Sequence, residues 1–143
     1  MKWRRKYPKL TVKEVKEKLK PLNQTFPPIF YEWMAEYHQA ELEDWIEIET
    51  EVDDRVFHRV FSLEQMVNLH QDDVDNDEGF EKIYPFAWDG GKNNFCFDYR
   101  DPKRPWIIFM DTDYFISYNP EAAEKVCRTF EEFLAILNEQ ITP

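Results

Sequence analysis

The chain has 143 residues, a formal net charge of −11 and 17% aromatic residues, which suits one domain with its own hydrophobic core. The acidic excess argues against binding to nucleic acid, because basic side chains supply most of the affinity for a phosphate backbone. No apolar run reaches the ~18 residues of a membrane span, the basic first residues lead into no apolar signal core, and Cys96 and Cys127 form no CxxC pair. We therefore expect a cytoplasmic protein with reduced thiols and no membrane partner.

The charge is distributed unevenly along the sequence. Residues 1–40 carry nine basic and four acidic side chains, whereas residues 41–83 carry three basic and fifteen acidic ones. Two interpretations of the acidic stretch stay open. It is a solvated surface that aids solubility, or a face that attracts a basic partner and speeds the encounter.

The N-terminal part predicts an arm followed by two helices. Residues 1–10 are a basic N-terminal arm that we expect to be poorly anchored. A helix begins at Thr11, which fits a capping box with Glu14, and Pro21 ends it. Pro28 suits the first turn of the second helix, where its missing N–H costs nothing. The apolar residues that follow have the spacing of a buried helix face: Ile29, Phe30, Trp33, Met34 and Tyr37.

The middle of the chain alternates between strand and helix patterns. In residues 45–52, apolar Ile46, Ile48 and Val52 alternate with glutamates, which predicts a strand with one apolar and one acidic face. Residues 55–61 predict a second strand. Residues 62–70 predict a short helix that begins with a Ser-x-x-Gln capping box, and residues 71–79 have no apolar period and predict a solvated loop.

Strand patterns then follow in close succession up to a final helix. Residues 82–88, 94–99 and 106–111 predict strands, and residues 114–118 are a further strand candidate. The turn at Asp89, Gly90 and Gly91 suits a hairpin because glycine tolerates positive φ, and the Asp89 carboxylate is expected to accept backbone N–H bonds there. Thr129 begins the last helix. The pattern predicts an α+β domain over residues 1–143: a mostly antiparallel β-sheet packed with N-terminal helices, one inserted short helix and a C-terminal helix.

Metal and catalytic motifs are weak throughout. With Asp73 at position 1 of a calcium loop, Asp75 and Asp77 take positions 3 and 5, but Glu78 stands where glycine is required and Tyr84 where glutamate is required. A solvated acidic loop or a partner-docking loop explains this segment better. The three histidines, His38, His58 and His70, have no zinc-binding spacing. We expect no catalytic, cofactor or metal site.

Several segments resemble a known family when taken in order. IYPFAWDGGKNNFCFDYRDP resembles the central motif of the SUKH superfamily, also called the Smi/Knr cell-wall-regulator-like family. PWIIFMDTD resembles its next strand, VCRTFEEFLAIL its closing helix, FPPIFYEWMAEY its early helix, and RVFSLEQM the strand-to-helix step between them. Within this motif, the residues expected to identify the fold are Pro85, Phe86, Asp89, Gly90, Gly91, Phe97 and Asp98.

The resemblance implies a SUKH-like α+β domain without a catalytic site. Bacterial members are commonly immunity proteins that bind the toxin domain of a polymorphic or contact-dependent system in the cytoplasm, and many such toxins are nucleases or deaminases. Eukaryotic members act in cell-wall regulation through protein contacts. The expected partner is thus a cognate protein toxin with a basic surface. The alternatives are a regulatory or scaffold module that binds a housekeeping protein, and an enzyme or metal protein.

Two sets of residues are the candidates for binding this partner. The first is acidic and would form the complementary face: Glu47, Glu49, Glu51, Asp53, Asp54, Asp72, Asp73, Asp75, Asp77 and Glu78. The second would provide apolar anchors: Trp45, Trp88, Tyr114 and Tyr118. Packing in the core or in a hairpin is the alternative role for each aromatic residue, and for Trp88 the two roles are equally supported.

Overall fold

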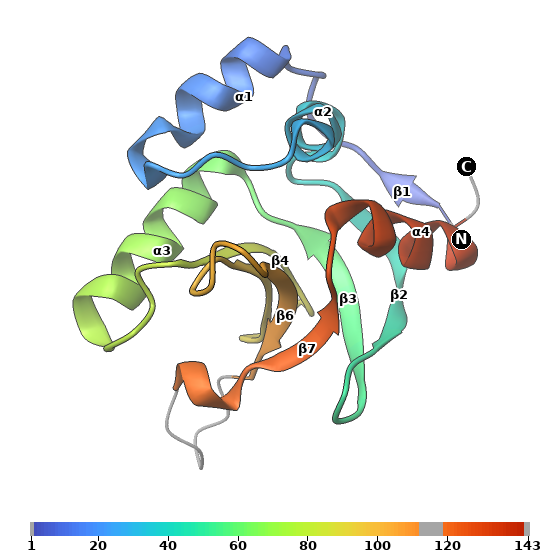
Figure 1. Ribbon diagram of the computed structural model, residues 1–143. Coiled ribbons are helices and arrows are strands. Elements are labelled where there is room, and N and C mark those ends of the chain that lie inside the picture. Colours follow the sequence, from blue (N-terminus) through green and yellow to red (C-terminus); the bar gives the residue numbers. More distant parts are fainter. Residues whose placement is uncertain (1, 112–118, 142–143) are drawn as a thin grey trace.

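A computed structural model describes residues 2–111 and 119–141, and within these ranges an antiparallel sheet of seven strands forms the centre of the fold (Figure 1). The strands are β1 (Trp3–Arg4), β2 (Glu41–Glu49), β3 (Asp54–Val60), β4 (Ile83–Trp88), β5 (Asn94–Asp98), β6 (Trp106–Met110) and β7 (Glu124–Cys127). The α-helices are α1 (Val12–Leu19), α2 (Pro28–Tyr37), α3 (Leu63–Asn76) and α4 (Phe130–Gln140), with short 3-10 helices at η1 (Lys20–Leu22) and η2 (Pro120–Ala122). The structure is the predicted α+β class.

Strand order in the sheet follows the order along the chain, from β1 to β7, and every neighbouring pair is antiparallel. The sheet curls, and the turn that joins β2 to β3 reaches β7, where the Glu51 N–H donates to the Lys125 carbonyl at 3.0 Å. Two segments that lie 74 residues apart in the sequence are therefore neighbours at one end of the fold.

Phenylalanine rings from two helices and the sheet fill the main core. Phe30 of α2 packs on Phe97 of β5 with ring centroids 4.7 Å apart, and Phe133 of α4 packs on Phe86 of β4 at 5.3 Å. Both pairs are close to perpendicular, an arrangement that aromatic quadrupoles favour. The periodic apolar residues of α2 and α4 thus bury their predicted faces against the sheet.

Predicted helix starts are confirmed at atomic detail. Thr11 and Ser62 each form a complete capping box, with Glu14 and Gln65 as the partners. The Thr129 hydroxyl accepts from the backbone N–H three residues later, and α2 begins at Pro28 as the sequence indicates. The three Thr and Ser caps satisfy backbone donors that a helix would otherwise leave unpaired, whereas Pro28 has no N–H to satisfy.

The solvated loop predicted at residues 71–79 is wrong in its first part, because α3 continues through Asn76. Val74 extends the apolar face of the helix one turn beyond His70. As a single apolar residue in an acidic segment, it gives only a weak helical pattern. Acidic residues near a helix C-terminus are unfavourable for the helix dipole. Side-chain amides secure the last turn, since Gln71 donates to the Asp75 carboxylate at 2.8 Å and Asn76 donates to the Asp72 carbonyl at 2.8 Å.

Three other expectations change. The N-terminal arm is anchored, because β1 pairs with β2 and the Trp3 ring packs 5.0 Å from that of Tyr37. Val52 does not continue the strand; it lies in the turn after β2 and is 65% exposed. Strand β7 was not predicted, and the strand candidate at 114–118 lies outside the described residues. Among the described helices, none is long and apolar enough to cross a membrane.

Candidate binding groove

A groove with a volume of about 790 Å³ lies where the β2–β3 hairpin, β7 and α4 meet. Acidic side chains from two of these elements line it: Glu47, Glu49, Glu51 and Asp54 from the hairpin and Glu139 from α4. The only basic residue among its described lining residues is Lys125, whose ammonium lies over the Trp106 ring at 4.9 Å from the centroid. The groove therefore has an acidic lining.

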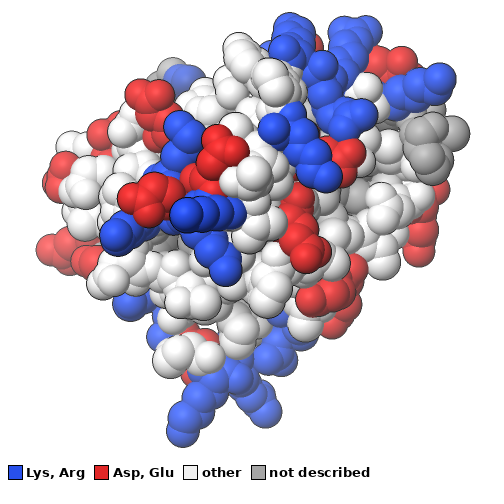
Figure 2. Space-filling model, turned by 90° about the horizontal axis from the view of Figure 1, so that it is seen from above, with Lys and Arg blue, Asp and Glu red and all other residues white. Residues whose placement is uncertain are grey.

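The end of the molecule at the top of Figure 1 has a different charge pattern. Figure 2 shows this end from above, with Lys and Arg side chains gathered in several places and acidic side chains between them. Helix α1 lies at this end and exposes Lys13, Lys16, Lys18 and Lys20. The net charge of −11 is thus not spread evenly over the surface.

Hydrogen bonds to the backbone fix both ends of the groove. At the hairpin end, the Lys125 N–H donates to the Glu51 carboxylate at 3.1 Å, next to the backbone bond between the same two residues. At the other end, the Gln140 side-chain amide of α4 donates to the Glu47 carbonyl of β2 at 2.8 Å. These hydrogen bonds therefore fix the distance between the walls of the groove.

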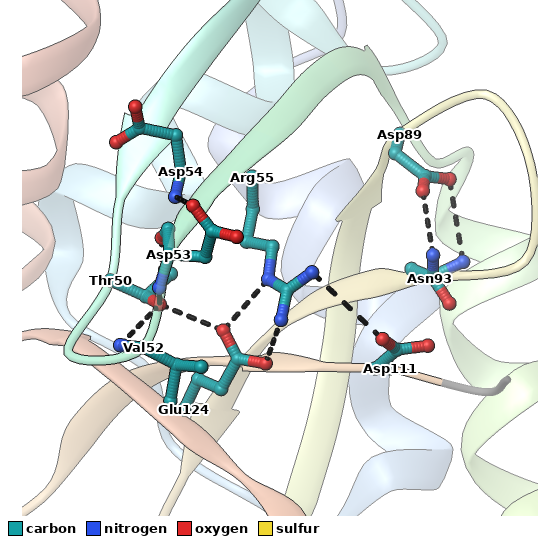
Figure 3. A network of polar contacts seen from close by, with 9 residues as sticks. All are labelled: Thr50, Val52, Asp53, Asp54, Arg55, Asp89, Asn93, Asp111 and Glu124. Atoms are coloured by element: carbon teal, nitrogen blue, oxygen red, sulfur yellow. Dashed lines mark hydrogen bonds and ion pairs between the residues drawn. The ribbon is translucent and has the colours of Figure 1, made fainter. Parts of the chain in front are cut away.

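A partly buried network supports the hairpin next to the groove (Figure 3). The Arg55 guanidinium of β3 forms a two-pronged hydrogen-bonded ion pair with Glu124 of β7, and the Thr50 hydroxyl donates to the same carboxylate at 2.7 Å. Asp111 lies 3.9 Å from the other side of the guanidinium. The hydrogen bond with Glu124 raises the pKa of Arg55, so the cation is held firmly in its charged form. This network fastens the turn of the hairpin to β7.

The predicted hairpin turn lies between β4 and β5 and is structural. The Asp89 carboxylate accepts from the Gly91 N–H at 2.7 Å. It also accepts from the Asn93 N–H at 3.3 Å and from the Asn93 side-chain amide at 2.9 Å (Figure 3). Gly90 has a φ of +89°, a value that side chains disfavour. The turn sets the register of two central strands.

The other motif residues of this region belong to the framework of the sheet. Phe86 and Phe97 are core residues, and Pro85 is paired with Cys96 beside a bulge in β4. Asp98 is 8% exposed and holds Arg100 through two side-chain bonds, at 3.0 and 2.8 Å. None of these groups lines the groove.

The structure brings together one part of the predicted partner-binding set and separates the rest. Trp45 precedes the groove on β2 and is 59% exposed, and the carboxylate of Asp53 is used within the turn, where it accepts from the Asp54 N–H. The α3 acids lie on the far side of the molecule from the β2–β3 turn (Figure 1): Asp72, Asp73 and Asp75 in the last turns of the helix, Asp77 at its end and Glu78 beyond it.

The aromatic anchors also divide. Trp88 is half-buried and stacks on Phe61 at 5.5 Å, with Arg59 over its ring, so it is packed rather than protruding. Tyr114 and Tyr118 lie outside the described residues. Among the predicted anchors that the structure describes, Trp45 is thus the one with a broad exposed face.

Sequence reasoning missed the far wall of the groove. Lys125 comes from β7, a strand of four residues, and Glu139 and Gln140 come from the exposed end of α4. The only local signal was two charged residues, Glu124 and Lys125, followed by two apolar ones, Val126 and Cys127, which does not distinguish a strand from a loop. Only the curling of the sheet brings these residues to β2.

Neither thiol is poised for nucleophilic chemistry. Burial raises the pKa of Cys96 well above its ordinary value and raises the pKa of Cys127 to about 12. Burial lowers the pKa of His70, whose ring stacks on Tyr84 at 4.5 Å and whose Nε2 lies 3.0 Å from the Glu81 carbonyl. In the part of the chain that the structure describes, no group of three or more His, Cys, Asp or Glu residues is arranged to hold a metal ion.

A comparison with protein families matches most of the chain. Residues 13–134 match the SUKH_6 family model, described as SMI1-KNR4 cell-wall. Searches of curated proteins and of solved structures found no match. The matched residues extend from α1 into α4 and include the hairpin, the Asp89 turn and β7.

Proposed function

This chain belongs to the SMI1-KNR4 family of the SUKH superfamily, and from this membership we propose that it is a non-catalytic immunity protein that binds and neutralises a cognate toxin domain. The partner is a protein with a basic surface, such as a nuclease or deaminase toxin domain. Binding takes place in the cytoplasm of the cell that the protein protects. No cofactor takes part.

The acidic groove is the observation that carries the choice of partner. It collects carboxylates from a β-hairpin and from the end of a helix 85 or more residues further along the chain, so the fold gathers charges that the sequence separates. A toxin that acts on nucleic acid needs a basic substrate surface. An acidic groove can cover such a surface, gain association rate from electrostatic steering, and gain orientation from charge complementarity.

The rigid framework around the groove also supports a binding role. Arg55, Glu124 and Thr50 fix the hairpin against β7. A preformed surface loses less conformational entropy on binding than a loop that must be ordered. The groove is therefore suited to recognition of one partner.

The direct test uses the neighbouring open reading frame. We expect it to encode a large secreted protein with a C-terminal toxin domain, whose expression alone stops growth and whose co-expression with this protein restores it. Isothermal titration calorimetry of the purified pair then measures the complex. Failure to bind that toxin domain and to restore growth would contradict the proposal, and stable capture of a housekeeping protein with no adjacent toxin gene would favour a regulatory or scaffold module instead.

A further inference from the structure

We propose that the groove receives a short, extended and basic segment of the partner, which pairs as an antiparallel strand with the free edge of β2 from Trp45 to Glu49. This inference rests on the proposed function, because it names the element of the partner that enters the groove. Its starting point is a stretch of sheet edge with no neighbouring strand among the described residues, and the lining charges select the occupant.

The edge of β2 that faces away from β3 is paired with another strand over only a small part of its length. Strand β1 pairs with β2 at Glu41 and Leu42 alone, whereas β2 continues to Glu49. The Glu43 N–H still donates to the Lys2 carbonyl at 3.1 Å, and among the described strands none pairs with this edge from Trp45 onward. An exposed strand edge carries backbone donors and acceptors that another strand can use.

The Gln140 contact shows which backbone groups face the groove. The Glu47 carbonyl accepts from the Gln140 side chain of α4, so it points away from β3 and toward the groove. Residues of an antiparallel strand alternate in the side to which their N–H and C=O groups point. Glu49, two residues later, therefore presents its backbone N–H and C=O on the same side. Gln140 occupies the position where the N–H of the residue opposite Glu47 in an added strand would donate.

The size of the groove limits the length of the segment. At the hairpin end the Glu51–Lys125 backbone bond closes the groove, so an added strand cannot extend past the position opposite Glu49. Residues 45–49 span about 13 Å at 3.3–3.4 Å per residue. This stretch of edge, whose Glu47 and Glu49 line the groove, thus accommodates about five residues, which suits the end of a hairpin or an exposed loop of the partner.

The side chains on the exposed face of β2 define the sequence of the segment. Trp45, Glu47 and Glu49 are all exposed and alternate along the strand, so they lie on one face. Residues directly opposite Glu47 and Glu49 in an added strand would be Lys or Arg, because cross-strand pairs of opposite charge are favourable and pairs of like charge are not. Asp54 and Glu139 add to the attraction from the surrounding walls. The residue opposite Trp45 is a third basic or apolar one.

N-methylated peptides separate strand addition from charge attraction. The probe is Lys-Val-Lys-Val-Lys-Val, with blocked ends. One derivative is methylated at the backbone nitrogens of its three lysines and the other at the backbone nitrogens of its three valines, so charge, composition and methyl count are equal. A lysine opposite Glu47 or Glu49 exchanges backbone bonds with it, whereas the intervening valines face away. We expect the valine-methylated peptide to bind like the parent and the lysine-methylated peptide to bind at least tenfold more weakly, as measured by fluorescence anisotropy.

Two further readouts locate the peptide. The parent peptide should slow hydrogen exchange of the Glu49 amide, and Gln140→Ala, a change at an exposed residue, should tighten binding a few-fold because it removes the competing donor. Equal binding of the two methylated peptides, or an unprotected Glu49 amide in the peptide complex, would overturn the inference. If the toxin domain binds and neutralisation succeeds while these peptide results fail, strand addition is wrong and the proposed function stands. If the toxin domain fails to bind, the proposed function falls independently of the peptide data.

Discussion

Arg55→Met tests the network that fastens the hairpin to β7. The substitution removes the guanidinium but keeps an apolar stem against the Phe109 ring, over which the guanidinium carbon lies at 5.4 Å. The Glu124 side chain, which is 7% exposed, then keeps a hydrogen bond from the Thr50 hydroxyl but loses its cationic partner. Breaking a buried ion pair by removing one partner costs about 3 kcal/mol, at the low end of the usual range because Arg55 is 25% exposed. For a chain of this length the melting temperature should fall by about 9 °C.

The double variant Arg55→Met with Glu124→Met is the matched control for this prediction. Urea unfolding followed by circular dichroism measures the free energy of unfolding of the original protein, of the single variants Arg55→Met and Glu124→Met, and of the double variant. The second substitution removes the buried carboxylate that the first one leaves unpaired, so it should restore most of the lost stability, since apolar residues often replace a buried ion pair at little cost. If the double variant is as unstable as the sum of the two single variants, the two residues are not coupled and the network does not stabilise the hairpin as described.

Three further predictions concern the framework. Burial lowers the pKa of His70 below its ordinary 6.5, so the stability gained by keeping the ring neutral is fully present above pH 6.5 and is lost as the pH falls. His70→Phe should therefore lose less free energy of unfolding than the original protein between pH 7.5 and 5.5. An equal loss in both proteins would contradict this. Gly90→Ala should cost at least ~1 kcal/mol in chemical unfolding, because φ is +89° and the new Cβ would lie 3.2 Å from the His58 ring, whereas a cost no larger than that of Gly91→Ala would argue against backbone strain. Thr129→Ala should lower the free energy of unfolding by about 1 kcal/mol through loss of the helix cap, with Thr129→Ser as the control that retains it.

Features set by neighbouring residues were predictable from the sequence. The capping boxes at Thr11 and Ser62 and the Asp89 turn depend on contacts within about four residues, and each has the predicted bonds. Alternation in β2 also placed the glutamates on the exposed face. Patterns of this kind survive folding because tertiary packing agrees with them.

Features that depend on distant contacts were not predictable. Strand β1 has two residues and exists because Trp3 packs on α2 and β3. Strand β7 has four residues with no extended alternation, and pairing with β6 determines it. The last turns of α3 looked like a loop because their acids outnumber the single apolar residue, Val74, that continues the buried face.

The same distinction applies to the candidate site. The acidic side of the groove was predicted from Glu47, Glu49 and their neighbours, since a charged strand face is visible in the sequence. Its other wall, including Glu139 and Gln140, follows from the curling of the sheet and the position of α4. The α3 acids equal the groove acids in number but lie elsewhere, so sequence charge alone did not separate the two surfaces.

Charge reversal on the two acidic surfaces tests the central claim most directly. Calorimetric titration with the cognate toxin domain compares two double variants. One carries Glu47→Lys and Glu49→Lys in the groove, and the other carries Asp72→Lys and Asp75→Lys on α3. All four residues are exposed, and both double variants change the net charge equally. We expect the groove variant to bind at least tenfold more weakly, a loss of about 1.4 kcal/mol or more, with a weaker dependence on salt, and the α3 variant to bind within twofold of the original protein. Full affinity in the groove variant, together with loss of binding in the α3 variant, would contradict the account.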